Sequence, residues 1–254
     1  MSGASTDARP AAAVLFWQES CATCALSKRF LAAAAVEFDS VDVGTDSGRA
    51  RWEGAGRPAL PAVVTGEVAT SISTLAQLAA AVGVEPPPGQ PVAQEAGECL
   101  ALLHAWLAHA RAFDWQLLSR PTPSRGRTLR ELTVNVFEQF EHAPEAWETG
   151  ELRRDPDDDA SRAAAFPSRQ ELVGWADGIA QRWGDFLLLH ERELDDAPPP
   201  FSSVRGMLEW GPFVSAKRWH TAFHYRELVE FCEAEGVPRP TGVLELASLR
   251  DLAL

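Results

Sequence analysis

A proline-rich stretch divides the chain of 254 residues into two parts with different sequence patterns. The stretch 85–91 reads Glu-Pro-Pro-Pro-Gly-Gln-Pro. Prolines stiffen an extended connector because they fix the backbone and lack a donor. All six histidines and seven of the nine tryptophans follow it. The sequence therefore predicts a flexible N-terminus over 1–11, a first domain over 12–84, a linker over 85–91 and a second domain over 92–254.

The composition of the chain excludes several classes of protein. It is 46% hydrophobic and 23% charged, which is typical of a globular protein with a sizeable core. It has no run of about 18 apolar residues, so we expect no membrane span. The net charge of −13 opposes a nucleic-acid partner or an acidic membrane surface, because phosphates attract clustered cations. The start of the chain lacks the pattern of a signal peptide, and we expect a cytoplasmic protein.

The first part of the chain alternates short apolar runs with segments of helical composition. The expected strands span 12–17, 36–43, 61–65 and 68–70, the last two as a hairpin. The expected helices span 24–35, 47–54 and 73–82. Such alternation of strands and helices predicts an α/β sheet with covering helices.

The second part of the chain changes to a helical period. Apolar residues recur three and four positions apart, which predicts amphipathic helices. These expected helices span 94–118, 128–149, 168–190 and 215–235. Ser168 and Glu171 form a capping box, and Gly236 is expected to end the last helix. Four helices of this length predict an all-α four-helix bundle.

Two cysteines, Cys21 and Cys24, follow the first expected strand and open the first expected helix. The first would lie at the helix N-terminus, where unpaired backbone N–H groups and the helix dipole stabilise a thiolate. We therefore predict a redox-active pair in which Cys21 is the nucleophile and Cys24 the resolving thiol. The alternatives are half of a zinc site or two thiols without a role. A structural zinc usually needs a second Cys or His pair, which residues 1–90 do not contain.

Residues 12–84 resemble a glutaredoxin-like member of the thioredoxin superfamily. The resemblance rests on the cysteine pair and on three further pieces, Val14–Trp17, Val41–Val43 and Leu60–Val64. It implies a thioredoxin-like fold in which Pro61 is cis and faces the redox cysteine. It also implies that the backbone of Leu60 binds a thiol ligand and that Ser71, where the family has glycine, borders the thiol site.

The second part of the chain places His220 and His224 four residues apart, on one face of the last expected helix. Such a pair binds a metal ion when a further protein ligand is present, although structural or surface histidines are commoner. Residues 100–236 resemble the DinB-like four-helix bundles, which include metal-dependent transferases of low-molecular-weight thiols and maleylpyruvate isomerases. The resemblance rests on Thr128–Leu132 and on the histidine pair.

The resemblance to DinB-like bundles implies a divalent metal, zinc or nickel, held by one histidine of the second helix and two of the last. The second-helix position falls on Asn135, which is a poor ligand for either metal. Glu138 and His142 follow on the same helical stripe, and either would complete a site with His220 and His224. The alternative is that the metal is lost and that Asn135 and the histidine pair bind a ligand directly.

The remaining histidines and cysteines of the helices are expected to be structural. Cys99 and Cys232 fall within helical patterns and read as small core residues. His104 and His109 lie five residues apart and so do not share one helix face, which favours packing roles for both.

Both resembled families handle small thiols, and together they predict a thiol–disulfide oxidoreductase of glutaredoxin type. A low-molecular-weight thiol such as glutathione, mycothiol or bacillithiol would be the co-substrate that reduces the cysteine pair, and the bundle would bind this thiol or the substrate. One alternative is a metal-dependent S-transferase in which a metal in the bundle activates a bound thiol. Another is a redox-responsive protein that binds a ligand or partner without turnover.

Overall fold

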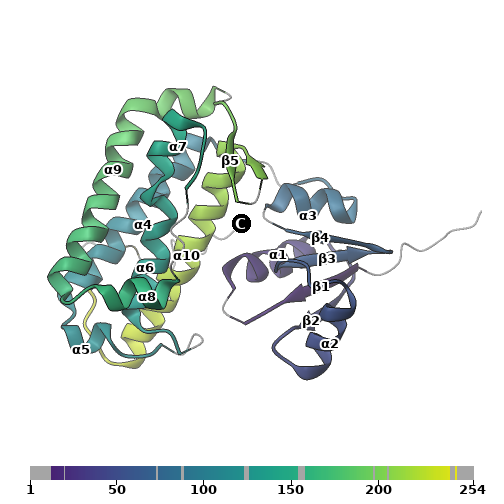
Figure 1. The fold of residues 1–254 in the computed structure, drawn as a ribbon, viewed down its shortest axis with the longest axis horizontal. Helices are drawn as coiled ribbons and strands as arrows, with labels where there is room; N and C mark the ends of the chain where they lie inside the picture. The colour runs from purple at the N-terminus through teal and green to yellow at the C-terminus, as the bar shows by residue number, and fades with distance from the viewer. Residues whose placement is uncertain are drawn as a thin grey trace, which may run out of the picture. The chain divides into compact units, whose positions relative to one another are not determined.

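The chain forms two compact units, residues 1–87 and 88–254, and the division falls within the stretch 85–91. The structure, a computed structural model, describes residues 13–19, 21–72, 74–86, 89–122, 126–153, 158–196, 198–204, 206–240 and 244. The expected flexible N-terminus, 1–11, lies outside the described residues. The first unit combines a sheet with helices, and the second is mostly helical (Figure 1). The predicted α/β arrangement followed by an all-α arrangement is confirmed at this level.

The first unit, which we call the sheet unit, alternates strands and helices as predicted. Its elements are β1 (Ala13–Trp17), α1 (Ala22–Ala33), β2 (Phe38–Asp42), α2 (Asp46–Gly54), β3 (Ala62–Thr65), β4 (Val68–Ser71) and α3 (Leu75–Val82). Gly83 ends α3 in the left-handed conformation, with φ of 72°, as its position in the sequence indicated.

The four strands of the sheet unit pair in the order β2-β1-β3-β4. Strand β1 runs parallel to β2 and antiparallel to β3, which is antiparallel to β4. Phe16 lies opposite Ala62, and Ala62 lies opposite Ser71. The carboxyl end of β1, the start of β3 and the end of β4 therefore meet at one edge of the sheet.

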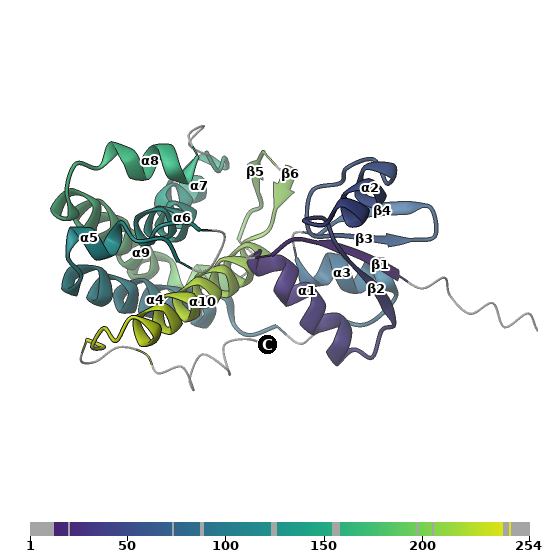
Figure 2. The same ribbon diagram turned by 90° about the horizontal axis from the view of Figure 1, so that it is seen from below.

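Alternate side chains of the central strands enter two separate cores, as the period of two in a strand requires. Ala13 and Leu15 of β1 pack with apolar side chains of α1 and α3. Val14 and Phe16 belong to the other core, which includes Trp52 of α2. Helices α1 and α3 thus cover one face of the sheet and α2 covers the other, an arrangement that Figure 2 also shows.

The second unit, which we call the helical unit, contains more elements than predicted. They are α4 (Val92–Ala112), α5 (Trp115–Leu118), α6 (Leu129–Glu141), α7 (Ala143–Thr149), α8 (Asp159–Ala165), α9 (Arg169–Asp195), β5 (Phe201–Ser203), β6 (Gly206–Leu208) and α10 (Trp210–Ala234). Helices α4 and α6 both pack against α9 and α10. Their shared core includes the fully buried Trp106, Phe137, Trp183 and Tyr225. Within the described residues, no helix is long and apolar enough to cross a membrane.

Two of the predicted helices are each divided in the structure. The helix expected over 94–118 breaks after α4, because the Asp114 side chain accepts a hydrogen bond from the Leu117 N–H and starts α5. The helix expected over 128–149 breaks at His142, between α6 and α7. Pro144 lacks the N–H that would continue the hydrogen-bond ladder of α6 through this point. The capping box predicted at Ser168 appears in part, since Ser168 accepts from the Glu171 N–H.

A buried ion-pair network joins α4 to α10. The Arg218 guanidinium of α10 lies 3.3 Å from the Glu95 carboxylate and also pairs with Glu98, both of α4. Arg218 and Glu95 are almost fully buried, and Ser215 donates to the second oxygen of Glu95. Removing one partner of such a pair leaves an uncompensated buried charge, so the network fixes how α10 faces its neighbours.

A second polar group is buried between α4 and α10. His109 is fully buried, with Nε2 3.4 Å from the Tyr225 hydroxyl and Nδ1 3.9 Å from the Cys232 sulfur. Burial, with a smaller contribution from Arg239, lowers the pKa of His109 to about 4. Cys99 and Cys232 are also fully buried, which confirms that both are core residues.

The neutral His109 makes the folded chain sensitive to acid. An unfolded chain takes up the proton near pH 6.5, whereas the folded chain keeps the ring neutral down to about pH 4. This group therefore leaves the free energy of unfolding at its full value above pH 6.5. As the pH drops toward 4, protonation of the unfolded chain lowers that free energy by about 3 kcal/mol. We expect His109→Gln to remove this part of the pH dependence, measured by urea unfolding across that range.

A matched control for this prediction is His104→Gln. His104 lies on the same helix with an exposed side chain, so its replacement removes a histidine of α4 without removing the buried ring. An acid dependence that is the same in His109→Gln and in the wild type would contradict the assignment of a buried neutral imidazole.

Candidate functional site

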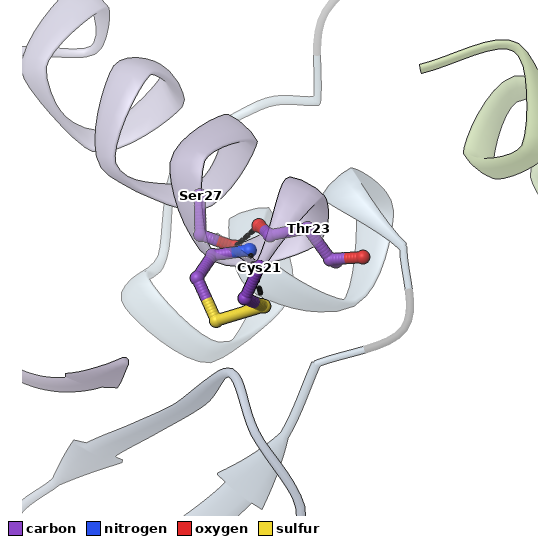
Figure 3. Close-up of a disulfide and its surroundings, with 4 residues drawn as sticks. Cys21, Thr23 and Ser27 are labelled. Atoms are coloured by element: carbon purple, nitrogen blue, oxygen red, sulfur yellow. Dashed lines mark hydrogen bonds between the residues drawn. A yellow bond between two sulfur atoms is a disulfide. The ribbon is translucent and has the colours of Figure 1, made fainter. Parts of the chain in front are cut away.

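Cys21 and Cys24 lie where β1 gives way to α1, and their sulfur atoms are bonded (Figure 3). The Cα atoms are 5.2 Å apart, within the range that a disulfide requires. Cys21 is the N-cap of α1, with an extended backbone. The predicted position of the first cysteine at the start of a helix is therefore confirmed, and the helix begins at Ala22 rather than at Cys24.

Two features at the start of α1 favour a thiolate at Cys21. The Cys24 backbone N–H donates a hydrogen bond to the Cys21 sulfur over 3.1 Å. Backbone N–H groups of a first helical turn have no partner within the helix, and the helix dipole places positive potential there. Both effects favour the anionic form of a sulfur at this position.

The two sulfurs differ in their access to solvent. The Cys24 side chain is 1% exposed, whereas Cys21 is partly exposed. A thiol or disulfide from solution therefore meets Cys21 first. This difference in exposure suits the predicted roles, an attacking Cys21 and a resolving Cys24.

Ser27 holds the first turn of α1 and was not identified from the sequence. Its fully buried hydroxyl donates to the Thr23 carbonyl over 2.9 Å, as Figure 3 shows. Thr23 lies between the two cysteines. The available signal was a serine one turn after Thr23, a spacing at which a hydroxyl bonds back to the helix backbone.

The Leu60–Pro61 peptide bond is cis, as the resemblance implies. The Pro61 carbonyl accepts from the Ile72 N–H over 2.8 Å, which extends the pairing of β3 and β4. Pro61 is buried, Leu60 is partly exposed and Ser71 is exposed. Strand register brings these three residues to the edge of the sheet where Cys21 caps α1. Their contact with a thiol stays a prediction.

A lysine of α1 lies at the same edge of the sheet. The Lys28 ammonium sits over the indole ring of Trp17, and Trp17 is paired with Asp42 at the ends of β1 and β2. Burial lowers the pKa of Lys28, and the Asp42 charge opposes this shift. The sequence showed a basic residue one turn after Cys24 but not its aromatic partner.

The helical unit brings His220 and His224 together on α10, with ring centroids 4.6 Å apart. The Nδ1 atom of His224 lies 2.6 Å from the Glu227 carboxylate. The Nδ1 atom of His220 is buried and has no hydrogen-bond partner among the described residues. Burial lowers the pKa of both histidines, and the nearby Arg127 charge adds to the effect.

Asn135 of α6 is joined to α8 rather than to the histidines. Its Nδ2 donates to the Asp159 carboxylate over 2.9 Å, and Asp159 also lies 3.7 Å from the Arg127 guanidinium. The Oδ1 atom of Asn135 is buried, and no described residue donates a hydrogen bond to it. Asn135 therefore retains one acceptor for a further group.

Glu138 and His142 have other partners than the histidine pair. Glu138 lies 3.5 Å from the Arg162 guanidinium of α8. His142 lies just beyond the end of α6, with φ of −110° and ψ of 7°, and its Nδ1 atom lies 3.2 Å from the Glu145 carboxylate. The expectation that His142 continues the stripe of Asn135 is wrong, because α6 ends at Glu141.

The described residues do not fit the expected zinc or nickel site. Within the ranges that the structure describes, no three His, Cys, Asp or Glu side chains are grouped so as to hold a metal ion. The cations Arg127 and Lys217 both act on His220, and positive charges oppose a divalent cation.

The chain matches no model of a known protein family, and no curated protein matches it.

The exposure of the four cysteines predicts how the reduced protein reacts with iodoacetamide under native conditions. Cys21 should be alkylated, whereas Cys24, Cys99 and Cys232 should be protected because each is at most 1% exposed. Burial also raises the pKa of the Cys99 thiol, and that of Cys232 to about 11. Mass spectrometry of the digested protein measures the modification at each position.

The control for alkylation is the same reaction in urea, where all four thiols should be modified because the chain is unfolded. Equal modification of Cys21 and Cys24 in the native protein would contradict the asymmetry of the pair.

The surroundings of the histidine pair also predict that no metal ion binds tightly there. With the cysteine pair kept oxidised, equilibrium dialysis against Zn²⁺ or Ni²⁺ should show no tight site that His220→Ala removes, because the neighbouring cations oppose it. His104→Ala, an exposed histidine of α4, is the matched control. One metal per chain, lost in His220→Ala and kept in His104→Ala, would restore the predicted metal site.

Proposed function

We propose that the chain is a thiol–disulfide oxidoreductase of glutaredoxin type that acts through the Cys21–Cys24 pair. The observation that carries this proposal is the difference between the two sulfurs. Cys21 is partly exposed and accepts a backbone hydrogen bond at the start of α1, whereas Cys24 is buried one turn further on. A pair with one accessible, stabilised sulfur and one protected sulfur suits two successive exchange steps.

The first step is attack by the Cys21 thiolate on one sulfur of a substrate disulfide. A Cys21–substrate disulfide forms, and the other substrate sulfur leaves as a thiolate that takes a proton from water. In the second step Cys24, as thiolate, attacks the Cys21 sulfur and expels the second substrate thiol. The substrate disulfide gains two electrons, and the Cys21–Cys24 disulfide results.

Two molecules of a low-molecular-weight thiol return the pair to its reduced form. The first attacks the partly exposed Cys21 sulfur and releases the Cys24 thiolate. The second attacks the resulting mixed disulfide, frees Cys21 and leaves as a small disulfide. The co-substrate is a thiol of the glutathione, mycothiol or bacillithiol type, and we assign the chemistry to the cytoplasm, where such thiols are kept reduced.

Several features of the sheet unit support a thioredoxin-like fold of the glutaredoxin type. The elements follow the order strand, helix, strand, helix, strand, strand, helix. The cysteine pair stands between β1 and α1, and a cis proline precedes β3. In this proposal Leu60, Pro61 and Ser71 line the site for the thiol, because strand register brings them to the edge that holds Cys21.

The helical unit, in this proposal, is a DinB-like four-helix bundle that selects the thiol or its substrate. Support comes from the mutual packing of α4, α6, α9 and α10 and from the polar side chains of α6 and α10. The S-transferase alternative requires a metal that the described residues do not fit. A ligand-binding role is favoured by the buried acceptor of Asn135 and the buried Nδ1 of His220.

The test is steady-state reduction of a small mixed disulfide by the full chain, with glutathione, mycothiol and bacillithiol compared as reductants. Cys21→Ser should lower the rate to that of the buffer, because no other described thiol is accessible. When reduced Cys24→Ser is mixed with the disulfide in the absence of free thiol, it should hold one substrate thiol on Cys21, seen as a mass increase of the intact protein, because no resolving thiol remains.

Cys99→Ala provides the control, since it removes a buried thiol of the helical unit and should keep the wild-type rate. Turnover that survives in Cys21→Ser, or a wild type with no activity toward any of the three thiols, would overturn the proposal.

A further inference from the structure

Hydrogen bonds order the backbone of Arg127 just before α6. The Arg127 carbonyl accepts hydrogen bonds from the Thr122 N–H at 2.7 Å and from the Thr122 hydroxyl at 3.0 Å. The next residue, Thr128, caps α6 through a capping box with Glu131. The backbone on both sides of Arg127 is therefore ordered by hydrogen bonds, and its side chain is 18% exposed.

One edge of the Arg127 guanidinium is buried and unpaired. The Nε and Nη2 atoms are inaccessible to solvent and have no hydrogen-bond partner within the described part of the chain. Leaving buried donors unsatisfied is costly, and native proteins rarely do so without a water or ligand. The Nε–H and Nη2–H bonds point the same way, which is the fork that pairs with both oxygens of a carboxylate.

The surroundings of Arg127 supply further groups for a ligand. The Asp159 carboxylate lies 3.7 Å from the Nη1 atom of Arg127 and accepts a hydrogen bond from the Asn135 Nδ2 atom. Asn135 keeps a buried oxygen without a donor, and His220 keeps a buried Nδ1 without a partner, among the residues described. The charges of Arg127 and Lys217 both reach His220 and lower its pKa. The cluster thus holds two cations, Arg127 and Lys217, beside the carboxylate of Asp159.

We propose that Arg127, Asn135 and His220 form a binding site for a small organic acid. Its carboxylate occupies the Nε–Nη2 edge of Arg127, and an N–H or O–H group next to the carboxylate donates to the Asn135 Oδ1 atom. The buried Nδ1 atom of His220 is the third polar atom of the site. The ligand class is therefore a carboxylate with an adjacent amide or hydroxyl group, such as a hydroxy acid or the end of a peptide.

The site extends the proposed function without depending on the cysteine pair. Every residue in it belongs to the helical unit, so binding is measurable whether or not Cys21 is active. A carboxylate-bearing thiol such as glutathione falls within the ligand class, which connects this site to the proposed selection of a small thiol.

The test is isothermal titration calorimetry of the full chain with N-acetylglycine, which carries a carboxylate next to an amide N–H. N-acetylglycinamide, which is uncharged, and inorganic phosphate serve as comparison probes. We expect saturable binding of N-acetylglycine at millimolar concentration, weaker binding of phosphate and none of the amide. Arg127→Gln should weaken binding about ten- to a hundredfold, the contribution of a hydrogen-bonded charge pair.

Two further variants make the result specific. Arg127→Lys keeps the charge and loses the fork, so it should bind more weakly than the wild type while remaining folded by circular dichroism. Arg111→Gln removes an arginine whose partner is Asp177 on the surface, and it should bind as the wild type does.

Three outcomes would overturn the proposal. One is the absence of saturable binding by N-acetylglycine in the wild type. Another is equal binding by Arg127→Gln, Arg111→Gln and the wild type. The third is tighter binding of phosphate than of N-acetylglycine, which would reassign the ligand class. None of these results bears on disulfide reduction by Cys21, so the two proposals fail separately.

Discussion

The pairing of β1 with β3 is the interaction on which the dithiol site depends. Backbone hydrogen bonds set Phe16 opposite Ala62, and this register brings together the end of one strand and the start of another. Cys21 follows the first strand, and the cis Leu60–Pro61 bond precedes the second. Alternating side chains of the same strands fill the cores on both faces of the sheet. The pairing that closes the two cores thus also assembles the edge that holds the sulfurs.

Helix α10 has a comparable double role in the helical unit. Arg218 faces α4, where Glu95 and Glu98 compensate its charge in the core. His220 and His224 lie on another side of the same helix, where the charge of Arg127 acts on both rings. The first face keeps the helix in one orientation because a slip would bury an uncompensated ion. The second face is then free to carry polar atoms that the fold itself does not use.

Local chemistry explains what the sequence predicts well. The position of Cys21 at a helix start, the Gly83 stop and the cis Pro61 all depend on neighbouring residues or on the family resemblance. The polar cluster of the helical unit depends on contacts across the chain, such as Asn135 with Asp159. A stripe drawn through Asn135 and His142 assumed an unbroken helix, and Pro144 invalidates that assumption. Arg127 carries no motif, and only the burial of its unpaired edge distinguishes it.

The deep burial of Cys99 and Cys232 has a consequence for the proposed exchange chemistry. Their thiols sit in the core with raised pKa values and lie outside the reach of oxidants that meet Cys21. In the proposed reaction, electrons therefore enter and leave the molecule through the Cys21–Cys24 pair. Disulfide shuffling between the two units has no accessible starting thiol in the helical unit. A change of redox state at the Cys21–Cys24 pair therefore breaks or forms no covalent bond in the helical unit.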